Sequence, residues 1–127
     1  MRCTVPLILS LLAISAQAIT PLPPDETVTG SLASGDLWSP ALGLHDEFTV
    51  ERQMGQILVI AASSEAVDLV LELHSAGGRR WINDDAHPGT VNPRLEVTLP
   101  EPGPLLLRVR PFLPQETGDY TLRLTAD

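Results

Sequence analysis

Three residue classes are scarce in this sequence of 127 residues: cysteine, lysine and the aromatic residues. The one cysteine is Cys3, near the N-terminus, which excludes a disulfide framework and leaves no thiol chemistry in the rest of the chain. Arginine fills all eight lysine-or-arginine positions, and against sixteen acids the formal net charge is −8. An acidic chain without a basic stripe argues against nucleic acid and anionic membranes as partners. Aromatic residues make up 4% of the chain, which limits stacking platforms for bases or sugars.

A hydrophobic run long enough to cross a membrane is also missing. The longest run, Val5 to Ile14, has about ten residues and includes a proline, whereas a spanning helix needs roughly 20. Arg2 precedes this run and Ala16-Gln17-Ala18 follows it as a small-x-small cleavage site, the pattern of a signal peptide. We therefore expect residues 1–18 to be removed and the mature protein to be periplasmic or extracellular, with no membrane span. Losing Arg2 leaves seven arginines against sixteen acids, a net charge of −9.

The common catalytic motifs are absent as well. There is no Gly-x-Ser-x-Gly turn, no phosphate-binding glycine loop and no His-Glu-x-x-His pair. His45 and His74 fall on the expected outward faces of strands, where we expect solvated side chains. Asp84 and Asp85 are adjacent in sequence, so they do not by that fact face each other across a glycosidic bond. The sequence predicts a non-catalytic protein.

What is present is alternation of apolar and polar residues with a period of two, which indicates strands. Such runs are centred on 44–51, 67–74, 95–99, 105–110 and 120–125, with glycine and proline between them. The continuous apolar run Ile57 to Ala62 indicates a central strand covered on both faces. We predict an all-β fold, an antiparallel β-sandwich of jelly-roll type with seven or eight short strands, over residues 28–127. The proline-rich residues 19–27 are expected to form an exposed N-terminal arm.

Four groups of short motifs occur in order along this region. They are Gly30-Ser31-Leu32 with Gly35-Asp36; 45–50 with Gly55 to Leu58; 68–73 with Gly77-Gly78 and Asn83-Asp84-Asp85; and 103–109 with Gly118 to Leu122. As an ordered set they resemble the bacterial pre-peptidase C-terminal domain, a β-sandwich related to collagen-binding domains and often appended to secreted peptidases. The chain departs from the family at Pro104-Leu105-Leu106, where a small residue and a tyrosine are usual.

The resemblance implies a binding or accessory module that assists adhesion or targeting to protein or polysaccharide. Two other functions remain open. One is a free-standing partner or chaperone of a separately encoded secreted enzyme. The other is a structural protein of the cell envelope.

The densest polar cluster, Asn83-Asp84-Asp85, has two interpretations. Calcium takes six to eight oxygen ligands, and this segment supplies carboxylate and amide oxygens. Asp36, Asp46 or Asp68 could add ligands from elsewhere in the fold. The resemblance favours Asp36 and Asp46, because related collagen-binding domains bind calcium near the segments that these two residues resemble. Alternatively, the three side chains cap turns by accepting hydrogen bonds from backbone N–H groups.

Candidate ligand contacts come from two tryptophans and from the arginines. Trp38 and Trp81 are anchors for recognition or, alternatively, close the ends of the sandwich. Arg108 and Arg110 occupy outward positions of one strand and Arg123 of the next. If these strands are neighbours, the three form a basic strip for a carboxylate-rich partner. The alternative is cross-strand pairing of the arginines with glutamates at positions 72 or 96.

Thermal melts in calcium and in excess chelator distinguish the two interpretations of the acidic segment. A calcium ion bound only by the folded state would raise the melting temperature by roughly ten degrees at a hundredfold excess over its dissociation constant. The double variant Asp84→Ala, Asp85→Ala would lose this shift. Coincident melts would instead identify the segment as a set of turn caps.

Overall fold

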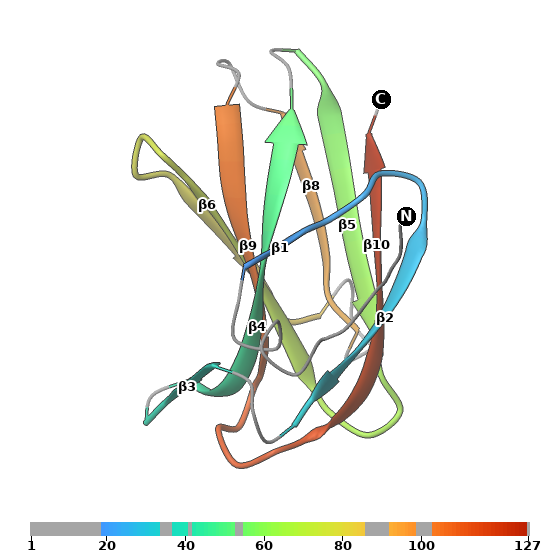
Figure 1. The fold of residues 1–127 in the computed structure, drawn as a ribbon, viewed down its shortest axis with the longest axis vertical. Helices are drawn as coiled ribbons and strands as arrows, with labels where there is room; N and C mark the ends of the chain where they lie inside the picture. Colours follow the sequence, from blue (N-terminus) through green and yellow to red (C-terminus); the bar gives the residue numbers. More distant parts are fainter. Residues whose placement is uncertain are drawn as a thin grey trace, which may run out of the picture.

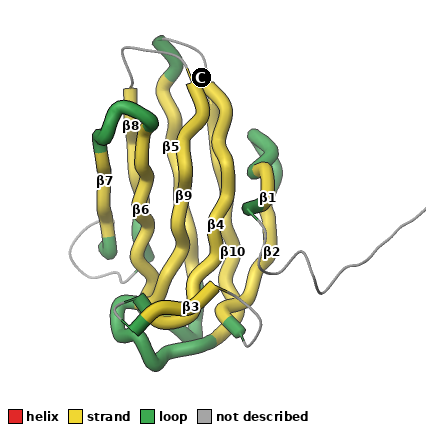
Figure 2. Tube along the Cα trace, turned by 60° about the vertical axis from the view of Figure 1, so that its left-hand side comes forward, coloured by secondary structure: helices red, strands yellow, loops and turns green. Residues whose placement is uncertain are grey.

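The structure is a computed structural model that describes residues 19–33, 37–40, 42–52, 55–85, 92–98 and 103–126. Figure 2 shows strands and loops in this part of the chain, which contains no helix that could cross a membrane. The predicted signal peptide, residues 1–18, lies outside the described residues and stays a prediction.

The described strands form two sheets that face each other as a sandwich (Figure 1). They are β1 (Thr20–Pro21), β2 (Thr27–Leu32), β3 (Leu37–Ser39), β4 (Gly43–Arg52), β5 (Ile57–Ser63), β6 (Leu69–Ser75), β7 (Arg80–Asn83), β8 (Arg94–Thr98), β9 (Gly103–Pro111) and β10 (Gly118–Ala126). One sheet has the order β1-β4-β9-β6-β7, with β3 also paired to β4, and the other has the order β2-β10-β5-β8. The all-β sandwich is confirmed. There are more strands than predicted because β1 and β3, of two and three residues, add short edge pieces.

The core between the sheets consists of the alternating residues that the sequence pattern singled out. The rows on β6, β9 and β10 are buried to 3% exposure or less: Leu69, Leu71, Leu73, Leu105, Leu107, Val109, Tyr120, Leu122 and Leu124. Alternate side chains of a strand point to opposite faces, so each of these strands gives one row to the core. Each fully buried leucine or valine side chain contributes roughly 1.5–3 kcal/mol to folding.

The expectation for Ile57 to Ala62 was wrong in one respect. This run forms β5, which does lie between two other strands, but only alternate residues of it are buried. Ile57 is 39% exposed, and Val59 and Ala61 are half-buried. The sandwich has two layers, so the outer face of β5 meets solvent even though its residues are apolar.

The N-terminal segment, predicted to be an exposed arm, is largely exposed, but it pairs with the edge of the sandwich and buries Leu22. Thr20 and Pro21 pair in parallel with Phe48 and Thr49 of β4. Leu22 is buried, and its backbone N–H donates to the Thr49 carbonyl at 2.9 Å. Proline suits an edge position because it has no N–H to offer on the unpaired side of a strand.

A tyrosine joins the two sheets where β2 and β10 meet. Tyr120 on β10 lies opposite Gly30 on β2, and a Cβ atom on Gly30 would lie 2.5 Å from the tyrosine ring. The Tyr120 hydroxyl donates to the Asp46 Oδ2 atom of β4, in the other sheet, at 2.5 Å. The missing side chain of Gly30 therefore makes room for a ring that crosses the core and satisfies a carboxylate.

A second link closes the opposite edge of the sandwich. The backbone N–H of Arg94, at the start of β8, donates to the Asn83 Oδ1 atom at the end of β7, at 3.0 Å. Because β7 and β8 belong to different sheets, this side-chain bond ties the two layers together.

The close approach at Gly30 predicts the effect of a single methyl group. Gly30→Ala is expected to lower the free energy of unfolding by about 2 kcal/mol, since an added methyl group in a filled space forces neighbours to move. Thr29→Ala, one residue away on the solvent side, is expected to change it by less than about 0.5 kcal/mol. Urea unfolding of both variants measures the difference. Equal effects would contradict the described contact between Gly30 and Tyr120.

Candidate functional site

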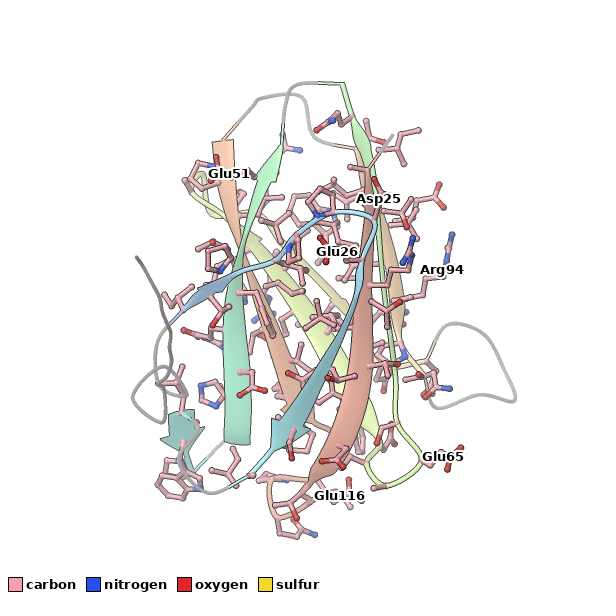
Figure 3. All side chains as sticks on the ribbon, turned by 45° about the vertical axis from the view of Figure 1, so that its right-hand side comes forward. Asp25, Glu26, Glu51, Glu65, Arg94 and Glu116 are labelled. Atoms are coloured by element: carbon pink, nitrogen blue, oxygen red, sulfur yellow. The ribbon has the colours of Figure 1, made fainter. Side chains whose placement is uncertain are left out.

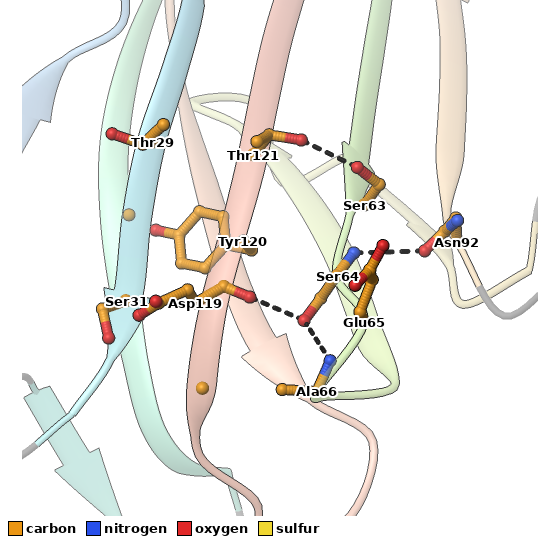
Figure 4. A pocket seen from close by; sticks show the side chains of 12 residues that line it. Thr29, Ser31, Ser63, Ser64, Glu65, Ala66, Asn92, Asp119, Tyr120 and Thr121 are labelled. Carbon is orange, nitrogen blue, oxygen red and sulfur yellow. Dashed lines mark hydrogen bonds between the residues drawn. The ribbon is translucent and has the colours of Figure 1, made fainter.

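An open depression of about 1150 Å³ lies on the outer face of the four-stranded sheet (Figure 4). Its floor comes from solvent-facing residues of three adjacent strands: Thr29 and Ser31 of β2, Asp119 and Thr121 of β10, and Ser63 of β5. The loop after β5 contributes Glu65 to the rim, and Asn92 lies near it. We call this depression the hydroxyl groove.

Several of its polar groups hold the local structure in place. The Ser63 and Thr121 hydroxyls are hydrogen-bonded at 2.7 Å across the two strands. The Ser64 hydroxyl donates a hydrogen bond to the Asp119 carbonyl at 2.6 Å and accepts hydrogen bonds from the backbone N–H groups of Ala66 and Val67, both at 3.0 Å. These three bonds fix the turn between β5 and β6. The lining residues that the structure describes include no histidine. What they offer is hydroxyl, carboxylate and amide groups for hydrogen bonds.

Carboxylates that form no ion pair within the described residues gather beside the groove, at the end of the sandwich where β5 and β7 finish and β6 and β10 begin. Figure 3 shows Glu65 and Glu116 at this end, with Glu51 toward the other end. We call it the acidic end and define it by Glu65, Asp68, Asp84, Asp85, Glu116 and Asp119.

The pKa of Asp68 shows the effect of this negative charge. Burial, followed by the carboxylates of Asp85, Glu116 and Asp84, raises the pKa of Asp68 above its usual range. The Asp68 Oδ1 and Glu116 Oε1 atoms are buried without a hydrogen-bond partner among the described residues. An ionised carboxylate in such surroundings costs stability, because burial and neighbouring negative charges both disfavour its charged form.

The outer face of the six-stranded sheet carries a network of paired charges instead. Glu72 is 4% exposed, and it accepts hydrogen bonds from Arg110 Nε, from Arg108 Nη1 at 3.3 Å and from His74 Nε2 at 3.1 Å. Arg108 also bonds Glu47 at 3.0 Å. Burial alone would raise the pKa of Glu72, but the hydrogen bonds from Arg110 and His74 and the charges of both arginines hold it below its usual range.

The predicted basic strip is not formed. Arg108 and Arg110 lie on β9, whereas Arg123 lies on β10 in the other sheet, so these arginines do not share a face. Arg123 donates to Thr27 at 3.3 Å. Arg108 and Arg110 pair with Glu72, which was the alternative expectation for them.

The structure separates the residues predicted to bind calcium. Asp46 accepts from Tyr120 inside the sandwich, and the Asn83 side chain accepts a backbone N–H, as a capping residue would. Asp84 and Asp85 belong to the acidic end, while Asp36 lies outside the described residues. Among the residues that are described, no three acids, histidines or cysteines are placed to hold a metal ion. Calcium binding therefore stays a prediction.

The two tryptophans do not form a common surface. Trp38 on β3 is 64% exposed, whereas Trp81 on β7 packs against the core. Strands β4, β9 and β6 separate them within the same sheet.

The histidines differ from the expectation of solvated side chains. His45 is buried, with Nδ1 3.0 Å from the Gly43 carbonyl oxygen, because β3 pairs opposite it and the backbone of Pro114 lies against Gly43. His74 is half-buried beside Glu72.

Sequence reasoning did not single out the hydroxyl groove. Its residues are ordinary outward-facing positions of β2, β5 and β10, and they gather only because β10 lies between the other two strands. The one available signal was the row of hydroxyl side chains on the outward side of residues 27–31. Such a row indicates a site only when its neighbouring strand is known.

The raised pKa of Asp68 predicts a stabilising substitution. A folded-state pKa above the unfolded value means that the ionised carboxylate destabilises the fold at any pH above the folded pKa. Asp68→Asn is therefore expected to raise the melting temperature at pH 7, and to lose this advantage near pH 3, below the unfolded pKa of about 3.9. Glu51→Gln, at the other end, serves as the control with little change. An unchanged or lower melting temperature for Asp68→Asn at pH 7 would contradict the described surroundings of Asp68.

No family model matches the sequence, and no curated protein matches it in sequence. Its fold, however, is shared by solved structures. The pre-peptidase C-terminal domain of a collagenase from Bacillus anthracis has 15% identity and a TM-score of 0.64, over 86% of this chain and 96% of that one. PliG of Aeromonas hydrophila, a periplasmic lysozyme inhibitor of g-type lysozyme, has 15% identity and a TM-score of 0.60, over 88% and 100%. PliG of Salmonella Typhimurium, a second such inhibitor, has 14% identity and a TM-score of 0.60, over 85% and 97%. The resemblance to the pre-peptidase C-terminal domain is thus confirmed at the level of the fold.

Proposed function

We propose that this protein is an exported, non-catalytic module that binds a separately encoded protein through its acidic end and the adjoining hydroxyl groove. The proposal rests on the position of the acidic end and the hydroxyl groove side by side on the sandwich. Glu65 and Asp119 belong to both surfaces, so a single partner would contact both. Negative charge that no described basic side chain pairs with favours a partner with a basic contact surface and speeds its approach.

The character of the groove favours a protein over a polysaccharide or a small ligand. Small-molecule sites are usually concave and mostly apolar, whereas this groove is open and lined by hydroxyl and carboxylate side chains. The one aromatic residue of its described lining, Tyr120, is 3% exposed and directs its hydroxyl toward Asp46 in the other sheet. The described lining therefore presents no exposed ring on which a sugar would stack. Protein interfaces, by contrast, commonly use polar side chains and bridging water.

The similar structures support the same proposal. Two of them are inhibitors, proteins whose task is to bind an enzyme rather than to transform a substrate, and they match this chain over almost their whole length. They favour the function of a free-standing partner of an enzyme over that of an adhesion module. The predicted signal peptide and the periplasmic location of the two inhibitors support export. Export predicts that the N-terminal residue of the mature protein is Ile19.

Site-specific photo-cross-linking in the producing cells tests the proposed surface. A photo-reactive residue in place of Thr29, within the groove, is expected to cross-link to one protein. The same residue in place of Thr98, on β8 at the other end of that sheet, is expected to give no such product. The yield at position 29 should fall as the salt concentration rises, because exposed charges are screened.

Charge reversal provides the matched control for this experiment. The double variant Glu65→Lys, Asp119→Lys is expected to abolish the cross-link at position 29. The double variant Glu26→Lys, Glu51→Lys changes the net charge equally but at the far end (Figure 3), and is expected to retain it. Equal cross-linking from positions 29 and 98, or equal loss in both charge variants, would show that the acidic end is not the binding surface.

A further inference from the structure

A second, smaller pocket lies on the outer face of the six-stranded sheet, next to the acidic end. Its volume is about 330 Å³. Val70 of β6, at 2% exposure, is the buried part of its lining, and Ile82 of β7 and Phe112 after β9 line it with 44% and 51% of their surface exposed. Asp84 and Arg110 supply the charged groups of the lining. Asn83 lines the pocket as well, so that three apolar side chains, one of them an aromatic ring, stand beside three polar ones, one of them a carboxylate.

The charge of Arg110 is already balanced. Arg110 is bonded to the buried Glu72, which also accepts from Arg108, and Arg108 in turn bonds Glu47. Two arginines and two glutamates make this network neutral. The electrostatic potential at the pocket is therefore determined by the acidic side chains outside this network.

Asp84 is one of those acids. It lies close enough to Asp68, together with Asp85 and Glu116, to raise the pKa of that carboxyl. Within the described part of the chain, no ion pair involves Asp84 or Asp85. The pocket therefore combines the apolar side chains of Val70, Ile82 and Phe112 with a carboxylate that has no cationic partner among these residues.

We propose that this pocket receives an arginine side chain of the protein partner. The aliphatic stem would pack on Val70 and Ile82, while the planar guanidinium stacks on Phe112 and donates to the Asp84 carboxylate. Arginine suits such a site better than lysine, because its flat, weakly hydrated head group stacks on aromatic rings and bonds carboxylates in a bidentate manner. This inference rests on the proposed function, in that it names one feature of the partner's basic surface.

Two properties of the pocket exclude other occupants. A leucine or another apolar side chain would cover Asp84 without offering it a donor, and burying an unpaired carboxylate is costly. The volume is near the lower end of the range of about 300–1,000 Å³ for ligand pockets, which suits one long side chain better than an extended ligand. Charge and shape together therefore favour a long, cationic, planar side chain.

Nuclear magnetic resonance titration of the mature domain with blocked tripeptides tests this inference without the partner. The probes are glycyl-arginyl-glycine amide and its counterparts with citrulline, lysine or leucine in the middle, each acetylated. We expect saturable shifts of the backbone amides of Ile82, Asp84 and Phe112 with the arginine peptide, at millimolar concentrations or below. The citrulline peptide, which has the same shape without the charge, is expected to bind about fivefold more weakly.

Substitutions locate the binding to the pocket. Asp84→Asn and Phe112→Ala each alter an accessible side chain and are expected to weaken binding of the arginine peptide about fivefold. Glu51→Gln is expected to leave it unchanged. Melting curves of all three variants confirm that they are folded.

Four results would overturn the inference: no saturable shifts; equal binding of the arginine and citrulline peptides; equal or tighter binding of the lysine or leucine peptide; or shifts spread evenly over all acidic residues. These results are distinguishable from a failure of the proposed function. If the protein without charge substitutions gives no cross-link from position 29, the proposed partner is refuted, while the titration reports on the pocket alone.

Discussion

The contact between Tyr120, Gly30 and Asp46 connects the core of the sandwich to its outer surface. The tyrosine ring fills the space where a side chain of Gly30 would stand, and this fixes β10 against β2. Its hydroxyl reaches Asp46 in the other sheet, so that a carboxylate facing the core has a strong donor. The same register places Ser31 opposite Asp119 and Thr29 opposite Thr121 on the outer face. The hydroxyl groove is therefore a consequence of how the core is packed beneath it.

The acidic side chains of this protein lie in two different environments. On the outer face of the six-stranded sheet, Glu72 is buried but bonded by two arginines and a histidine, so it stabilises the fold when ionised. At the acidic end, Asp68 and Glu116 each keep a buried oxygen without a donor among the described residues, and the pKa of Asp68 is raised. Groups that reduce stability are often retained for function. This contrast sets a neutral charge network on the six-stranded sheet apart from a negative end of the sandwich, and thereby gives a direction for a basic partner to approach.

The sequence predicted those features that depend on local alternation. The rows Leu69-Leu71-Leu73 and Leu105-Leu107-Val109 are buried as expected, because a strand needs only its own pleat to direct them to one side. The ordered motifs around Gly30 and Gly118 also indicated the correct fold. In the structure these two motifs lie on adjacent strands and pack the tyrosine, which gives them a structural role.

Features that depend on which strands are neighbours were not accessible from the sequence. Arg108 and Arg123 occupy similar outward positions, yet consecutive strands can lie in different sheets, and here they do. His45 and Glu72 are outward-facing but buried, because neighbouring strands and long arginine side chains cover them. The acidic end likewise combines loops that are distant in the chain, and no local pattern connects Glu116 with Asp84.

The central claim is that the acidic end and the hydroxyl groove form the binding surface. Hydrogen exchange of the protein alone and in complex with its cross-linked partner tests this claim most directly. The account predicts slower exchange in the complex at residues 63–66, 84–85 and 118–121, with residues 94–98 and 104–108 unchanged. Protection confined to 94–98 or 104–108, with 63–66 and 118–121 exchanging as in the free protein, would contradict it.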